Sequence, residues 1–149
     1  MQFMDFFRAN AIDPSWVKLY TSRGTESYHH KLFMRYTVLF VDLLIFYPAV
    51  LFYHYFSKAK HRHVTKQSIL LLILFYPGLI LIDYGHFQYN CVSLGLFIWS
   101  VIAFEHEYDI AGSITFSMAL NYKQMELYHA LPIFCFLLGK AWQQSWSKW

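Results

Sequence analysis

The sequence is 149 residues long, with 57% hydrophobic residues, 14% charged residues and a formal net charge of +3. A soluble globular domain carries about 25% charged residues, so this composition excludes an ordinary soluble domain and predicts a membrane protein. The basic residues are scattered or lie beside apolar runs rather than forming a basic face. We therefore expect no nucleic-acid partner.

The beginning of the chain, residues 1–35, is mixed and polar. Asp13 followed by Pro14 is typical of a helix cap and a first helical position, and predicts a short helix. Residues 36–56 are almost wholly apolar, and a helix of that length, about 32 Å, crosses a bilayer core of about 30 Å. Asp42 lies within this run, where a carboxyl group needs a partner. We expect a neutral, hydrogen-bonded acid that faces the helical bundle.

A basic loop follows, from Lys58 to Lys66, and it contains no acidic residue. A short basic loop beside a span marks the cytoplasmic side of the membrane. The next apolar run, residues 68–82, is interrupted by Pro77-Gly78 and would cover only about 22 Å as a single helix. We expect either a broken helix or a helix that begins inside the basic loop.

Three further apolar runs complete the chain, at residues 91–104, 110–120 and 130–139. Short or interrupted spans occur where protein or a water-filled cavity surrounds part of the backbone. The predicted fold class is all-α, a polytopic membrane helical bundle with about five short or broken transmembrane segments. Its predicted parts are a luminal loop with an entry helix (1–35), a transmembrane helical region (36–140) and a cytoplasmic tail (141–149).

With the basic loop on the cytoplasmic side, the polar segments 21–31, 83–90 and 121–129 all fall on the opposite, luminal face. Ionisable groups at the ends of short spans need partners or a hydrated cavity. A polar cavity walled by Tyr and Phe suits an amphipathic substrate with an apolar tail and a charged or sugar head. The candidate substrate-binding residues are Arg23, Glu26, Asp83, His86, Gln88, Asn90, Lys123, Glu126 and His129.

Each of these candidates also has a plainer structural interpretation. Asp83 and His86 are three residues apart, so they fit a local pair or a helix cap. Lys123 and Glu126 have the same spacing and fit an ion pair on one turn of a helix. These alternatives stay open from the sequence.

The histidines raise a different function, because histidines on separate helices can ligate haem. The topology places His54 near the cytoplasmic side and both His86 and His129 on the luminal side, which leaves a single pair for one haem. The two cysteines, Cys91 and Cys135, lie in apolar runs without the spacing of a metal site. We expect buried thiols, and no metal site.

Two segments carry a family resemblance: IDYGHFQYN at residues 82–90 and NYKQMELYHALP at residues 121–132. Together with residues 21–27, 31–35 and 42–45, they make a region from about Asp13 to Lys140 that resembles the dolichol-dependent alpha-1,3-glucosyltransferases of N-glycan precursor assembly. The second segment is similar to the members that add the first glucose. The resemblance implies a partial GT-C-type fold in the endoplasmic reticulum membrane.

The resemblance further implies dolichyl-phosphate-glucose as donor, a mannose-rich oligosaccharide on dolichyl pyrophosphate as acceptor, and no cofactor. In the family, an aspartate of the first luminal loop is expected to deprotonate the acceptor hydroxyl while it displaces dolichyl phosphate with inversion. The departing phosphate needs cationic or hydrogen-bonding neighbours. By position and chemistry, our candidates for that role are Arg23, His86, Gln88 and Lys123.

The sequence departs from the family at its beginning. The residues before Asp13 show no counterpart of the family's first luminal loop. We therefore expect the catalytic base to lie outside this sequence, and the sequence to be a fragment of a longer enzyme. The alternative is a non-catalytic membrane protein of the same ancestry that acts as a partner or regulator of the enzyme.

Overall fold

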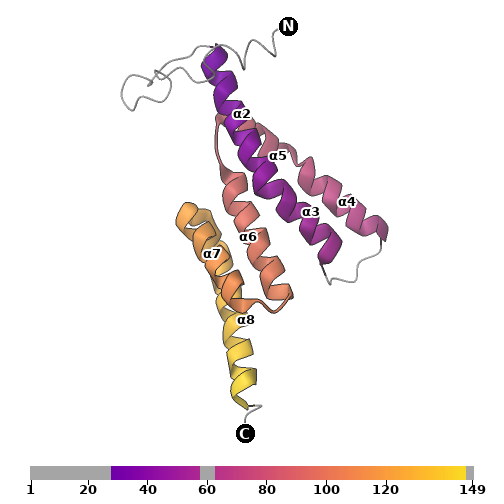
Figure 1. Ribbon diagram of the computed structural model, residues 1–149, viewed down its shortest axis with the longest axis vertical. Coiled ribbons are helices and arrows are strands. Elements are labelled where there is room, and N and C mark those ends of the chain that lie inside the picture. The colour runs from indigo at the N-terminus through magenta and orange to yellow at the C-terminus, as the bar shows by residue number, and fades with distance from the viewer. Residues whose placement is uncertain (1–27, 58–62, 147–149) are drawn as a thin grey trace. The chain divides into compact units, whose positions relative to one another are not determined.

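A computed structural model of the protein describes residues 28–57 and 63–146, and these residues form helices joined by short turns (Figure 1). The helices are α2 (Tyr28–Leu44), α3 (Phe46–Phe56), α4 (His63–Leu74), α5 (Pro77–Leu79), the π-helix η2 (Ile80–Gly85), α6 (Asn90–Glu105), α7 (Asp109–Tyr122), the 3-10 helix η3 (Gln124–Glu126) and α8 (Leu127–Trp146). The chain divides after Tyr36 into two units, and the features below belong to the second unit. The described residues contain no strand, which confirms the predicted all-α class.

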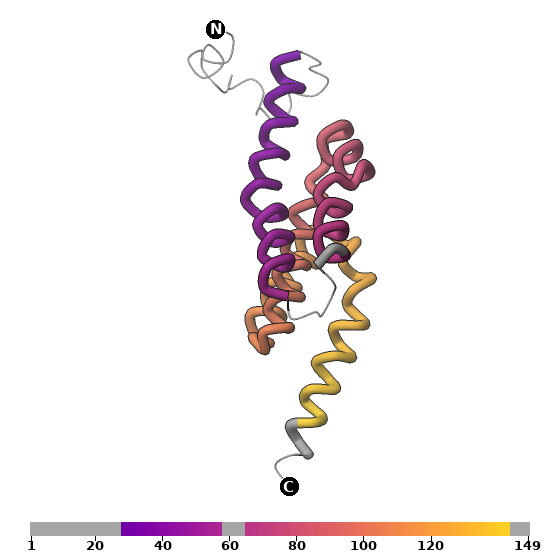
Figure 2. The backbone as a smooth tube through the Cα atoms, turned by 90° about the vertical axis from the view of Figure 1, so that its right-hand side faces the viewer, coloured from indigo at the N-terminus to yellow at the C-terminus, as the bar shows by residue number. Residues whose placement is uncertain are grey.

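Two prolines explain where the first long helices are interrupted. Pro48 has no N–H to offer the carbonyl of Leu44, and α2 ends at that residue before α3 resumes along the same line (Figure 2). Pro77 opens α5, and the residue before it, Tyr76, has the extended backbone that a following proline favours. The second apolar run is therefore a broken helix, and it also begins inside the basic loop, at His63. Both predicted possibilities apply.

Within the described residues, two helical stretches are long and apolar enough to cross a membrane: Tyr28–Phe56, with 29 residues, and Thr65–Gly85, with 21. Helix α6 is apolar but has 16 residues, about 24 Å of helix. The two spans agree with the first two predicted apolar runs, and membrane crossing by α6, α7 and α8 stays a prediction.

Large apolar side chains cover the outside of the helices. Soluble proteins rarely expose contiguous apolar surface on this scale, because it is costly in water and favourable in lipid. Among the exposed side chains are Phe40, Leu72, Phe75, Leu81, Ile110, Leu127, Tyr128, Leu131 and Trp142. This distribution supports a bundle that faces lipid.

Helix α6 is the centre of the described bundle. It runs antiparallel beside α7 and also packs against α3, which in turn packs against α4 (Figure 1). Phe46, Val50 and Cys91 form a buried core cluster between α3 and α6. Gly95 permits the close approach: a Cβ there would lie 2.9 Å from Cγ2 of Ile45 and 3.1 Å from the Phe46 Cα.

Polar contacts join the helix ends that the sequence assigns to the cytoplasmic side. Ser57 Oγ donates to Glu105 Oε1 at 3.0 Å, and Lys66 Nζ donates to the Ser57 carbonyl at 3.5 Å. Lys140 Nζ lies 2.7 Å from Asp109 Oδ1. These three contacts link the end of α3 to the end of α6 and to the start of α4, and link the start of α7 to Lys140 of α8.

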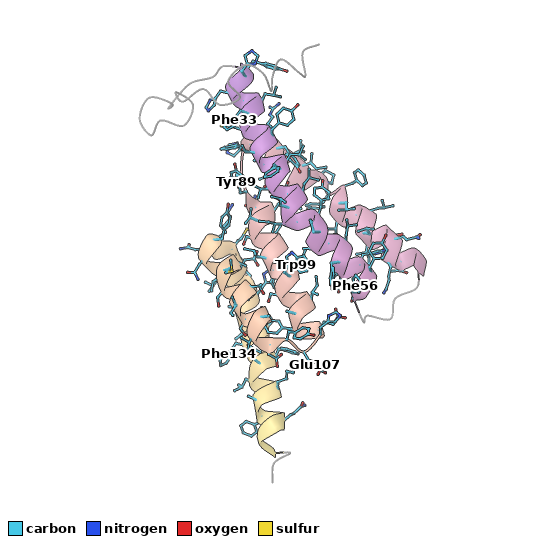
Figure 3. The ribbon with its side chains drawn as sticks, viewed as in Figure 1. Phe33, Phe56, Tyr89, Trp99, Glu107 and Phe134 are labelled. Atoms are coloured by element: carbon cyan, nitrogen blue, oxygen red, sulfur yellow. The ribbon has the colours of Figure 1, made fainter. Side chains whose placement is uncertain are left out.

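The opposite end of α6 carries a different set of contacts. Figure 3 shows Tyr89 and Glu107 at opposite ends of this helix. Tyr89 and Thr37 share a hydrogen bond of 2.9 Å between their hydroxyl groups. Thus Tyr89 marks the end of the bundle that the sequence assigns to the lumen, and the candidate site residues are found there.

The boundaries differ from the predicted ones. Helix α2 begins at Tyr28, within the predicted luminal loop, and α8 continues to Trp146, within the predicted tail. Polar residues are compatible with a helix that extends beyond the bilayer, so a change of polarity along the sequence does not have to coincide with a helix end. Cys135, expected to be buried, is exposed on α8, because apolar surface in a membrane bundle can face lipid. The helix predicted at Asp13-Pro14 lies outside the described residues.

Candidate functional site

Seven of the nine predicted site residues are described, and they lie in the turn before α6 and around η3. Arg23 and Glu26 lie outside the described residues. Most of the seven side chains take part in two hydrogen-bonded groups, one around Asp83 and one around Glu126. His86 is exposed at the end of η2.

Asp83 acts as a remote cap for α6. Its side chain is 0% exposed and accepts the backbone N–H of Cys91 at 2.9 Å and the side-chain amide of Asn90 at 2.7 Å. The Cys91 thiol also donates to it, at 2.7 Å. The first turn of a helix has unpaired N–H groups, and an acceptor carboxylate there satisfies them. The capping interpretation of Asp83 is therefore confirmed.

The turn between η2 and α6 reverses sharply. Phe87 has a φ of 58°, in the left-handed region that non-glycine residues rarely adopt. The reversal lets the Gln88 N–H bond the Asp83 carbonyl at 3.2 Å. It also brings the Gln88 side-chain oxygen within 3.1 Å of the Asn90 amide nitrogen. This strained turn positions two amide side chains at the start of α6.

Lys123 joins this group from the end of α7. Its ammonium group donates to the side-chain oxygens of Gln88, at 3.4 Å, and of Asn90. Both acceptors are neutral amides, so these contacts hold the positive charge in place without neutralising it.

The predicted ion pair between Lys123 and Glu126 is wrong. Lys123 has an extended backbone, with φ −147° and ψ 129°, between α7 and η3. The helical spacing that would bring the two side chains together therefore does not apply. Lys123 turns to the start of α6, and Glu126 turns into the bundle.

Glu126 is the centre of the second group. It is 0% exposed, accepts the Ser93 hydroxyl at 3.0 Å on Oε1, and lies 2.8 Å from His129 Nδ1 on Oε2. The imidazole of His129 stacks on Phe97, with ring centres 4.0 Å apart and planes 23° apart. Three elements, α6, η3 and α8, thus contribute one polar cluster.

Asp42 lies beside the first group. It is 1% exposed and accepts the Tyr84 hydroxyl at 2.6 Å, in agreement with the expected hydrogen-bonded acid. One donor atom from each of Asp42, Asp83 and Cys91 lies within 4.8 Å of the others, a spacing that a cation could bridge. In the structure the Cys91 thiol donates to Asp83 and the Tyr84 hydroxyl donates to Asp42, so these groups already have hydrogen-bond partners within the protein. We interpret this group as a hydrogen-bonded core.

The histidines of the haem alternative lie at both ends of the bundle. His54 lines a cavity with Ser57 and Lys66, at the end of the bundle opposite Tyr89. His129 is bonded to Glu126 through Nδ1. The pairing of His86 with His129 on one haem stays an alternative from the sequence.

Several partners in these groups do not stand out in the sequence. Ser93 and Tyr84 hold Glu126 and Asp42. Ser93 is an isolated polar residue within an apolar run, and Tyr84 is one of several aromatic residues in the polar segment 83–90. The sequence indicates these partners only indirectly, through the acid itself, because an acid inside a membrane bundle needs a hydrogen-bond donor nearby.

Together, Lys123, Gln88 and Asn90 present amide and ammonium groups at one end of the bundle, an arrangement suited to an anionic, oxygen-rich group. Over residues 2–149 the sequence matches the ALG6, ALG8 glycosyltransferase family. The chain belongs to this family. The resemblance seen in the sequence is therefore confirmed, and so is the membrane helical fold that it implies.

Named relatives of this family member are similar over most of its length. It is 60% identical over 137 residues to the dolichyl pyrophosphate Man9GlcNAc2 alpha-1,3-glucosyltransferase of Mus musculus, covering 92% of this chain and 27% of the relative. Probable enzymes of the same name share 48% identity over 135 residues in Drosophila melanogaster, with 91% and 28% covered, and 46% over 145 residues in Arabidopsis thaliana, with 93% and 26% covered. The chain thus spans about a quarter of the length of these relatives.

Proposed function

We propose that this chain is part of an alpha-1,3-glucosyltransferase of the endoplasmic reticulum membrane. The enzyme transfers glucose from dolichyl-phosphate-glucose to the mannose-rich oligosaccharide on dolichyl pyrophosphate. Membership of the ALG6, ALG8 glycosyltransferase family and the names of the relatives support this activity. The apolar spans support a lipid-linked substrate.

The reaction requires a base, and the two buried acids near Lys123 are already engaged. The acceptor oxygen forms a bond to the glucose anomeric carbon, the bond from that carbon to the phosphate oxygen breaks, and a base takes the hydroxyl proton. Asp83 and Glu126 are both 0% exposed and already accept hydrogen bonds. We propose that they hold the structure, and that an aspartate elsewhere in the enzyme is the base.

The observation that carries the proposal is the fixed, unneutralised charge of Lys123. Its contacts to Gln88 and Asn90 use two of the three ammonium protons. The remaining proton can be directed at a substrate oxygen. Dolichyl phosphate gains negative charge as it leaves the sugar, and a cation held in advance at that position stabilises the transition state.

The test uses the longer enzyme that carries this segment, assayed for transfer of labelled glucose from dolichyl-phosphate-glucose to lipid-linked oligosaccharide. Lys123→Met should lower kcat/KM by about 10²-fold, on the scale of a lost oxyanion donor, and Lys123→Arg should recover part of the loss. Lys140→Met is the matched control, since Lys140 is also paired but lies at the opposite end of the bundle.

Equal activities of Lys123→Met and Lys140→Met would contradict the role of Lys123. Absence of glucose transfer by the intact parent enzyme would contradict the proposed activity itself. That result would favour the alternative of a non-catalytic membrane protein of the same ancestry.

A further inference from the structure

The Glu126–His129 pair is more elaborate than the packing of the bundle requires. Glu126 is fully buried where η3 meets α8, and each of its carboxylate oxygens has its own partner, Ser93 or His129. Burying a carboxylate is unfavourable unless it is paired. An apolar residue at this position would pack without that requirement, so the acid calls for a further explanation.

The pair orients the imidazole and determines which nitrogen carries a proton. An ionised carboxylate only accepts hydrogen bonds, so Nδ1 of His129 is the donor in the 2.8 Å contact to Glu126. Stacking on Phe97 fixes the plane of the ring. The second nitrogen, Nε2, is then the one that remains for another molecule, and the His129 side chain is 41% exposed.

Charge favours an anion at this nitrogen. An imidazole that carries two hydrogens donates through both nitrogens, so with Nδ1–H directed at Glu126 the Nε2–H can donate to an anion. His129 lies in the first turn of α8, where the helix dipole adds partial positive charge. Lys123, which precedes η3 at the same end of the bundle, is cationic and is held by neutral groups.

We propose that His129 is a binding residue for a phosphate oxygen of a polyisoprenyl-linked substrate. Nε2–H donates to that oxygen, and Glu126 is the positioning residue that orients the ring. The inference rests on the proposed function and assigns its substrate phosphate to a particular side chain. The shared ligand chemistry is a phosphate ester, present as a monophosphate in the donor and as a pyrophosphate in the acceptor.

Two variants distinguish the role of Nδ1 from the role of Nε2 in His129. His129→Asn places an amide near the position of Nδ1 and removes the outer donor, whereas His129→Gln places an amide near the position of Nε2 and removes the contact to Glu126. In the longer enzyme we expect His129→Asn to raise the KM of one lipid substrate by about tenfold, and His129→Gln to retain most of the affinity. Glu126→Gln should fall between the two.

Measuring the KM of dolichyl-phosphate-glucose and of the lipid-linked oligosaccharide separately identifies the source of the phosphate. A rise for either substrate supports the proposal, and the substrate affected names the ligand. Unchanged KM values in His129→Asn would overturn it. Equal losses in both His129 variants, accompanied by lower thermal stability, would show a structural role and would also overturn it.

A binding measurement tests the His129 site independently of whether the protein transfers glucose. The intact protein in detergent is titrated separately with a short-chain polyprenyl monophosphate and with the pyrophosphate, and the corresponding polyprenyl alcohol is the ligand that lacks phosphate. The parent protein and Lys140→Met should prefer the phosphate, and His129→Asn should lose about tenfold of that preference. Equal binding of the monophosphate and equal binding of the pyrophosphate by the parent and His129→Asn contradict the site, whether or not the protein transfers glucose.

Discussion

At the scale of single residues, the buried acids are the most informative positions. Asp42, Asp83 and Glu126 are all almost completely inaccessible, and each accepts a hydrogen bond from a donor on another element or in the next turn of the chain. Such groups connect elements, since removing an acceptor leaves buried donors unsatisfied.

Asp83→Ala should destabilise the protein by about 1–3 kcal/mol, because it leaves the backbone N–H of Cys91 and the Asn90 amide without their acceptor. The measurement is thermal unfolding of the purified protein in detergent. His86→Ala is the matched control from the same turn, and an exposed side chain should change the stability by less than about 0.5 kcal/mol. Equal stabilities of the two variants would show that Asp83 is not a cap.

At the scale of elements, the contact between α3 and α6 depends on a small residue. Gly95 lies opposite Ile45, the residue between α2 and α3 where the helix is interrupted. Membrane helices approach closely where glycine removes the side chain from the interface. The proline break and the glycine therefore belong to the same contact.

Gly95→Ala should weaken this contact and destabilise the protein by about 1–3 kcal/mol, since the added Cβ would lie 2.9 Å from an Ile45 carbon and 3.1 Å from the Phe46 Cα. Gly139→Ala is the control, because a Cβ at Gly139 meets no atom within 4 Å. There, the better helix propensity of alanine should leave stability unchanged or raise it by up to about 1 kcal/mol. Thermal unfolding in detergent compares the two, and a Gly95→Ala protein as stable as the parent would contradict the close packing.

At the scale of the whole molecule, the polar contacts divide between the two ends of the bundle. Ser57, Glu105, Asp109 and Lys140 form pairs at one end. The groups around Asp83 and Glu126 lie at the other end, where α6 begins. The predicted topology assigns the first end to the cytoplasm and the second to the lumen.

Cysteine labelling in sealed microsomes tests this assignment. A membrane-impermeant maleimide added outside should label Lys60→Cys at once, and should label Gln124→Cys only after the membrane is permeabilised. The parent protein measures the background from Cys91 and Cys135, of which Cys91 is buried. The reverse order of labelling would invert the topology and place the candidate site in the cytoplasm.

Local sequence properties determined much of this protein. The scarcity of charge and the long apolar runs predicted a membrane bundle, because lipid leaves helices as the spanning structure. Pro77 indicated an interruption, since proline lacks the N–H that a helix needs. The segments 82–90 and 121–132 indicated the family.

The tertiary structure alone decided which polar groups meet. Lys123 and Glu126 are three residues apart, yet their side chains bond to partners on α6, because the extended backbone at Lys123 ends the helical spacing. The sequence by itself supplied the chemistry of these residues and predicted the helices. It also predicted that the site faces the lumen. The pairing of Glu126 with Ser93 and His129 follows only from how α6, η3 and α8 pack, since hydrogen bonds between distant residues depend on distances that no local pattern contains.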